Sequence, residues 1–255
     1  MKVFRNALVI FAIVGSVFCV SLLSSLPAAF VVRQVDKRVP LSQRAFELKM
    51  ATGTVWDGRG WLSVGELGGE LVWRATPAGL LRGSLPVALQ MAGTDLELQA
   101  LLALDPRGSV ELRSGAGHFG LRRLDPLLQR HGIQIEGDVV IAEASARVER
   151  RSGWPSAALA RLDWAGGEVR FPVSGQNRSA RLPALKGGLD LQGEDLVLLV
   201  DLASSGSNLL EIRLQRDLVA RIHVRKRLLD ELGLPWAQQV DADTIIFRVQ
   251  QRLKL

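Results

Sequence analysis

The sequence has little of several residue types that would indicate particular classes of protein. Tyrosine is absent and aromatic residues make up 5% of the 255 residues, so a core must be built mainly from Leu, Val, Ala and Trp. The single cysteine, Cys19, excludes an intrachain disulfide framework and a cysteine-based zinc site. The three histidines, His118, His131 and His223, do not have the spacing of metal ligands. The net charge of +6 is too small for a chain of this length to indicate nucleic-acid binding.

Sequence motifs for catalysis are also missing. The chain has no Gly-Lys-Ser/Thr phosphate-binding loop and no Gly-x-Ser-x-Gly nucleophile elbow. Four glutamates fall in strand-like segments with no acid–base partner in view, so we expect them to face solvent: Glu111, Glu136, Glu143 and Glu149. These observations favour a protein that is not an enzyme and that has no cofactor or metal site.

One glycine motif resembles a nucleotide-binding fingerprint. Residues 115–120 read GAGHFG, after a short strand-like segment and before a segment that could be helical. A dinucleotide fold would need alternating strands and long helices around this motif, and Pro126 stands inside the helix that should follow. We therefore expect a glycine-rich turn between β-strands.

An uncharged segment follows the N-terminal cations Lys2 and Arg5. Residues 7–26 read ALVIFAIVGSVFCVSLLSSL, and a helix of this length spans the roughly 30 Å of a bilayer's hydrocarbon core. The positive-inside rule keeps residues 1–6 in the cytoplasm. A cleaved signal peptide is the alternative, but the apolar run is long for one and Pro27 is unfavourable near a cleavage site. We expect a retained transmembrane anchor over 7–32 and a periplasmic domain over 33–255.

The rest of the chain shows the period-2 alternation of β-strands, with turn residues between the runs. The segments 62–67 and 244–255 are two examples, and in the second one face is apolar and the other cationic. Short helices are expected only at 122–131, with Asp125 as N-cap, and at 225–233. The fold class is therefore mainly β, with one large antiparallel β-sheet domain.

A weak internal repeat suggests two similar halves. Trp61 is followed by a strand containing Leu-Val-Trp73, and Trp154 by a strand containing Leu-Asp-Trp164. The spacing differs by two residues, so two readings stay open. Either the domain has β halves at about 40–130 and 131–255, or the tryptophans fill the thin ends of a single β core.

The order of several short motifs resembles the protein N family of the type II secretion system, the general secretion pathway of Gram-negative bacteria. Behind the anchor come TGTVWDGR at 52–59, LVWR at 71–74, TPAGLLRG at 76–83, GWP at 153–155 and LDW at 162–164. In that family a Gly-Thr-(Val/Leu)-Trp-x-Gly segment leads to a Leu-x-Trp strand and a Ser/Thr-Pro continuation. The resemblance covers about residues 20–170, and the C-terminal third matches only in general character.

The resemblance implies a non-enzymatic accessory component of the type II protein secretion machinery. Such a protein is anchored in the inner membrane, has its bulk in the periplasm and contacts the inner-membrane assembly platform, with the outer-membrane secretin as a second candidate partner. It carries over no catalytic residues and implies no nucleic acid or small-molecule substrate. The motif residues are expected to define the fold: Trp56, Gly58, Trp73, Pro77, Gly83, Trp154, Pro155 and Trp164.

Two modes of action remain open from the residues alone. Exposed strand edges would offer backbone pairing to a partner protein, which suits a scaffold or bridge. Long antiparallel sheets rich in Leu, Val and Ala could instead form an apolar groove, which suits a periplasmic lipid-handling protein. A continuous apolar trough open to solvent would favour lipid handling, and a closed core filled by side chains would favour scaffolding.

Overall fold

The computed structural model describes residues 26–30, 46–64, 67–129, 132–150, 152–173, 176–236 and 239–252. The expected anchor over 7–32, including Cys19, lies outside the described residues except for 26–30. Among the described segments, no helix combines the length and the apolar character needed to cross a membrane.

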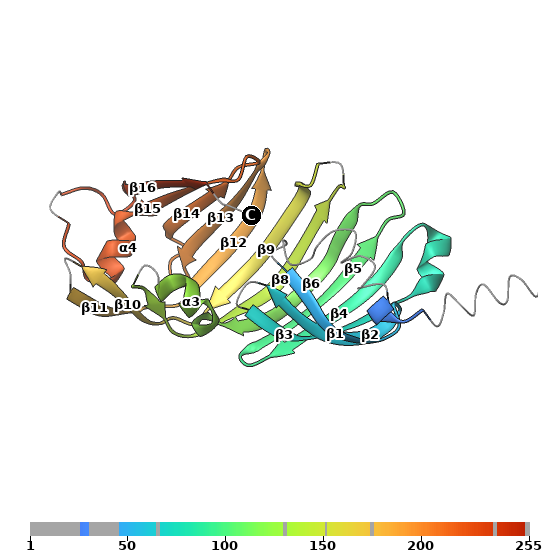
Figure 1. Cartoon of the computed structure of the whole chain (residues 1–255). Coiled ribbons are helices and arrows are strands. Elements are labelled where there is room, and N and C mark those ends of the chain that lie inside the picture. The colour runs from blue at the N-terminus through green and yellow to red at the C-terminus, as the bar shows by residue number, and fades with distance from the viewer. Residues whose placement is uncertain are drawn as a thin grey trace, which may run out of the picture.

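The domain is dominated by one curved antiparallel sheet of 13 strands (Figure 1). Its strand order is β1-β2-β3-β4-β5-β6-β8-β9-β12-β13-β14-β15-β16. The strands of this sheet are β1 (Phe46–Gly53), β2 (Asp57–Val64), β3 (Leu67–Ala75), β4 (Leu85–Gly93), β5 (Leu96–Leu104), β6 (Val110–Gly120), β8 (Asp138–Val148), β9 (Pro155–Trp164), β12 (Leu185–Gln192), β13 (Asp195–Leu202), β14 (Asn208–Leu214), β15 (Val219–Arg225) and β16 (Ile245–Arg252).

A second, small sheet interrupts this sequential order. Its strands are β7 (Gln134–Ile135), β10 (Gly167–Val173) and β11 (Gln176–Leu182), in the order β11-β10-β7. The chain leaves the large sheet after β9, forms the β10–β11 hairpin and returns as β12, which pairs with β9. The excursion gives the domain a second layer beside the strands of its C-terminal half (Figure 1).

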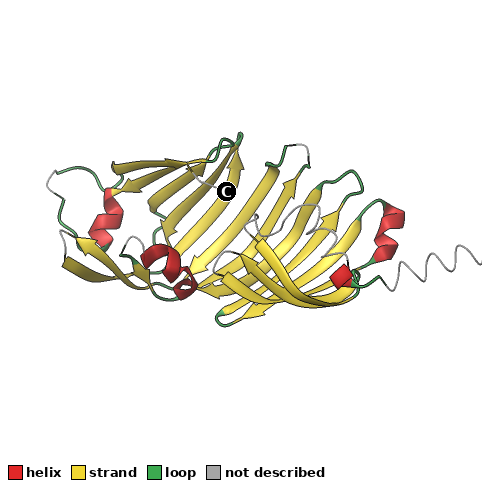
Figure 2. Ribbon diagram, in the orientation of Figure 1, coloured by secondary structure: helices red, strands yellow, loops and turns green. Residues whose placement is uncertain are grey.

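Within the described residues, helix is limited to short segments outside the sheets (Figure 2). Two 3-10 helices, η2 (Pro77–Arg82) and η3 (Leu121–Leu124), follow β3 and β6, and α3 (Asp125–Leu128) continues from η3. The last helix, α4 (Lys226–Glu231), follows β15 and is stopped by Gly233, whose φ of 65° suits glycine. The expected helix at 225–233 is therefore confirmed.

A cluster of buried apolar residues lies where the two sheets meet. It consists of Val139, Trp164, Val169 and Leu182, with partly buried apolar residues of both sheets and of α4 packed against it. Burial of such side chains is the main favourable term in folding. The small sheet is therefore held on the large one by hydrocarbon contact.

The fold class is confirmed in its main part, a mainly β chain with a large antiparallel sheet. Three local expectations were wrong. The segment 62–67 is not one strand, because β2 ends at Val64 and pairs with Leu67 at the start of β3. Val64 and Leu67 are directly opposed and share one face although they are three residues apart, so period-2 alternation does not run through this connection. In the next helix Asp125 is the first helical residue, and Leu124 is the N-cap.

The third correction concerns GAGHFG, which lies within β6 and is not a turn. Gly117 has a φ of 150°, and a Cβ there would lie 2.1 Å from the carbonyl oxygen of Glu97 on β5. The glycines therefore permit close approach of neighbouring backbone, and the register of β6 against β8 shifts on both sides of Gly115. The motif serves the sheet and has no nucleotide-binding context.

Candidate functional site

The inner face of the large sheet carries a continuous apolar surface. The register places one residue from each strand between β2 and β16 in a single cross-strand row, and no member of that row is polar. The row runs Gly60, Leu71, Met91, Leu98, Gly117, Ile141, Leu162, Gly187, Val200, Leu210, Val224 and Phe247. A second row, from Gly58 to Val249, is also free of polar side chains. Together they line a surface that we call the trough.

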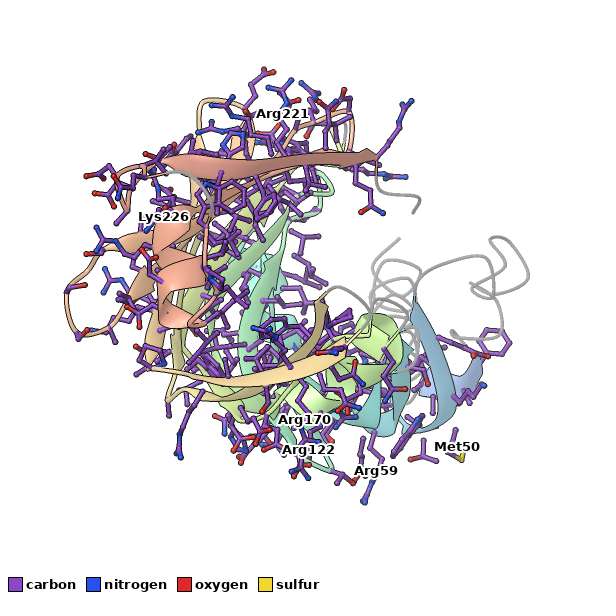
Figure 3. All side chains as sticks on the ribbon, turned by 90° about the vertical axis from the view of Figure 1, so that its left-hand side faces the viewer. Met50, Arg59, Arg122, Arg170, Arg221 and Lys226 are labelled. Carbon is purple, nitrogen blue, oxygen red and sulfur yellow. The ribbon has the colours of Figure 1, made fainter. Side chains whose placement is uncertain are left out.

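The trough is open over much of its length in the described part of the chain. Most of its side chains are only half-buried, and Phe247 and Val249 are 45% and 49% exposed. Figure 3 looks along the sheet from the end where α4 lies and shows side chains of mostly carbon on its inner side. An apolar surface of this extent left uncovered is uncommon in soluble monomers and marks a binding surface. This is the feature that the lipid-handling alternative requires.

The outer face carries many charged side chains, and several of them form local ion pairs. Arg59 and Arg221 project from this side (Figure 3). Three of the glutamates singled out from the sequence form ion pairs with arginines and do not face another acid. The pairs are Glu111 with Arg147 at 2.8 Å, Glu143 with Arg161 at 3.0 Å and Glu136 with Arg122 at 3.6 Å. The hydrogen bond from Arg147 lowers the pKa of Glu111. Across the described ranges, no three His, Cys, Asp or Glu side chains are placed to hold a metal ion.

The first group of motif residues, Trp56, Gly58 and Trp73, gathers at the start of β2. The Thr54 hydroxyl accepts hydrogen bonds from the backbone N–H groups of Trp56 and Asp57, at 3.3 and 3.0 Å. The indole Nε1 of Trp73 donates to the Thr54 carbonyl at 3.2 Å. A Cβ on Gly58 would lie 2.5 Å from the Trp73 ring, so glycine at this position leaves the space that the ring occupies. The geometry fits a structural role.

Pro77 and Gly83 bracket η2. Pro77 occupies the first turn, where its fixed φ and missing N–H are tolerated. Gly83 closes the helix with a φ of 83° and donates its backbone N–H to the Leu80 carbonyl at 3.0 Å. These residues connect β3 to β4.

The second group, Trp154, Pro155 and Trp164, lies along β9. Trp154 Nε1 donates to the Glu194 carbonyl at 2.8 Å, which ties the start of β9 to the β12–β13 turn. Pro155 begins β9, and Trp164 ends it with 8% exposure and an Nε1 bond of 3.2 Å to the Glu136 carbonyl. The indole N–H groups of Trp73 and Trp164 thus each bond to a backbone carbonyl in a connection between strands, Thr54 and Glu136 respectively. That the motif residues define the fold stays a prediction.

The two edges of the large sheet differ. On β1 the register shifts between Lys49 and Thr52, and Met50 has a φ of 51°, so this edge is bulged. On β16 the register with β15 is regular from Phe247 to Arg252. Trp236 packs edge-on against Phe247 with ring centroids 5.4 Å apart. β16 is therefore the flatter edge and the better template for a further strand.

Sequence reasoning identified most of the strands and left an apolar trough open as one of two alternatives, but it did not predict the difference between the two edges. The available signal was the apolar set in each strand. The apolar residues of the separate strands could be recognised as one surface only once the cross-strand register was known.

A family model described as type II secretion system protein N matches residues 44–235. The matched range includes every strand of both sheets except β16, and it reaches well beyond residue 170. No curated protein and no solved structure matches the chain significantly.

Proposed function

Because the chain belongs to the type II secretion system protein N family, we propose that it is a non-enzymatic, inner-membrane-anchored scaffold of the secretion machinery. Membership is carried by a family match over residues 44–235 and makes the protein a component of type II secretion. The resemblance seen in the sequence motifs is thereby confirmed. The scaffold role rests in addition on the outer edge of β16, which pairs with no further strand among the described residues.

The β16 edge suits strand addition by a partner protein. Six of its eight residues are exposed, and its side chains alternate between the apolar trough and a cationic outer face. Arg248 and Arg252 lie on that outer face and make no ion pair within the described chain. A complementary strand would carry apolar residues beside Phe247 and Val249 and acidic residues beside the two arginines.

The proposed anchor, residues 7–32, would join the domain at the opposite edge. Residues 26–30 are attached there, since Pro27 bridges to Thr54 and the Val55 N–H donates to the Leu26 carbonyl at 3.0 Å. At about 4.8 Å per strand spacing the large sheet measures roughly 60 Å from β1 to β16 along its curve. A membrane-tethered protein with the bulk of its chain in the periplasm would thus present β16 away from the tether, as a bridge requires.

The proposed partners are proteins of the inner-membrane platform, with the outer-membrane secretin as the second candidate. The test is detergent co-purification of the full-length protein from secreting cells, comparing Arg248→Glu with Arg59→Glu, which reverses a charge on the outer face of β2. We expect secretion components with wild type and Arg59→Glu, and reduced recovery with Arg248→Glu. Wild-type protein that brings down no secretion component would contradict the proposal.

A further inference from the structure

The trough deepens into a pocket where the small sheet and α4 lie over β9 and β12–β14. The pocket has a volume of about 600 Å³, within the usual range for ligand sites, and its lining is hydrocarbon apart from Asp163. Leu162, Leu198 and Ile212 come from the large sheet, and Val169 and Phe171 from β10. The pocket is continuous with the trough because Leu198 and Ile212 belong to the second cross-strand row.

The chemistry of this lining favours an apolar ligand that has no peptide groups. The strands beneath the pocket are paired with neighbours on both sides, so their N–H and C=O groups are already used. The Trp164 indole N–H is also engaged, by the Glu136 carbonyl. A polar ligand or an extended peptide would lose its hydrogen bonds to water and find no replacement here. A hydrocarbon chain makes no hydrogen bonds to water and therefore loses none on entering the pocket.

A cation lies on the same side of the small sheet as the pocket-lining residues. Arg178 on β11 pairs with Phe171 on β10 and shares a face with Leu182, and Phe171 and Leu182 both line the pocket. Its side chain is exposed and makes no ion pair among the described residues. An unpaired arginine beside a hydrocarbon pocket complements an anionic head group attached to an acyl chain.

We propose that this pocket binds an acyl chain of an anionic membrane phospholipid, with Arg178 at its phosphate. The apolar rows connect the pocket with the edge of the sheet at which the proposed anchor enters. They provide a path along which a lipid chain stays out of water. The site is separate from the β16 edge, so lipid binding and partner binding can fail independently.

The test uses full-length protein reconstituted in vesicles of phosphatidylethanolamine and phosphatidylglycerol, with a trace of phosphatidylglycerol carrying a photoreactive acyl chain. Leu198→Trp fills the pocket. Leu199→Trp is its matched control, because Leu199 is the next residue on β13 and faces the other side of the sheet. We expect Leu198→Trp to lower labelling of β12–β14 by about tenfold or more, the equivalent of losing burial of about two CH₂ groups. Leu199→Trp should label as wild type does.

A second pair of variants tests the head group without touching the pocket. Arg178→Glu should abolish the preference for photoreactive phosphatidylglycerol over photoreactive phosphatidylethanolamine. Arg181→Glu, on the opposite face of β11, should leave it unchanged. Labelling confined to residues 1–32, equal labelling of both Leu variants, or cross-linking of the pocket to a second copy or to another protein in place of lipid would overturn the proposal.

Discussion

Replacing Trp164 by alanine should strongly destabilise the domain, because this ring joins the two sheets. Trp164 is 8% exposed and packs with Val139, Val169 and Leu182. Its ring also lies between two glycines, since a Cβ on Gly137 or Gly167 would come within 2.6 or 3.2 Å of it. A well-seated ring of this kind leaves a cavity that the backbone cannot readily close. Trp→Ala in a core costs about 3–5 kcal/mol, or roughly 6–20 °C in Tm for a chain of this size.

The assay is thermal unfolding of the detergent-solubilised full-length protein, followed by circular dichroism in the strand region. Trp164→Phe should fall between wild type and Trp164→Ala, because it keeps much of the apolar contact and loses the bond to Glu136, worth about 1 kcal/mol. The matched control is Trp61→Ala, since Trp61 is 40% exposed opposite Glu70 on the outer face and should cost about 1 kcal/mol or less. Equal Tm values for Trp164→Ala and Trp61→Ala would refute the structural role.

Three further predictions concern other parts of the chain. Gly58→Ala should lower the free energy of unfolding by about 1–3 kcal/mol, because its Cβ would lie 2.5 Å from a backbone oxygen. A Cβ on Gly188 meets nothing within 4 Å, so Gly188→Ala should be neutral or stabilising by about 0.4–1 kcal/mol. Urea unfolding of both variants measures the difference. Intact-mass spectrometry of the membrane-extracted protein should show Met1 or its immediate neighbour retained, and a mature start just after the apolar segment would contradict the anchor. Because Arg147 lowers the pKa of Glu111, that carboxylate stabilises the fold above its ordinary pKa of about 4.3, and the gain is lost as pH falls through the lowered value. Glu111→Gln should therefore melt below wild type at neutral pH and approach it in acid, and a Tm difference independent of pH would contradict the pairing.

Local alternation in the sequence was enough to predict a strand-dominated domain, because most strands carry their own apolar set, and capping and helix-forming residues predicted the short helices. The partner of each strand could not be predicted in the same way. β12 pairs with β9 across the whole β10–β11 excursion, and Val169 and Leu182 of that excursion pack on Trp164 of β9, a long-range contact that local alternation does not reveal. GAGHFG was misplaced because glycine marks both turns and strands that neighbouring backbone approaches closely, as Gly117 does.

The trough illustrates a second limit of sequence reasoning. Leu98, Ile141 and Val200 each read as half-buried strand positions, and their sequence does not say whether another layer covers them. Whether these positions are covered depends on where the elements outside the large sheet pack. Here β10, β11 and α4 meet only the C-terminal part of the inner face, so a pocket forms there while the rest of the described trough stays open.

The most direct test of the central claim, that the protein works as a bridge through its β16 edge, is photo-cross-linking in secreting cells. A photoreactive residue is placed at Gln250 on β16, and control residues at Met50 on the bulged β1 edge and at Gly188 in the middle of the sheet. The account predicts cross-links from Gln250 to a platform protein or the secretin, and none from the two controls. Cross-links to secretion proteins from Met50 or Gly188, with none from Gln250, would contradict it.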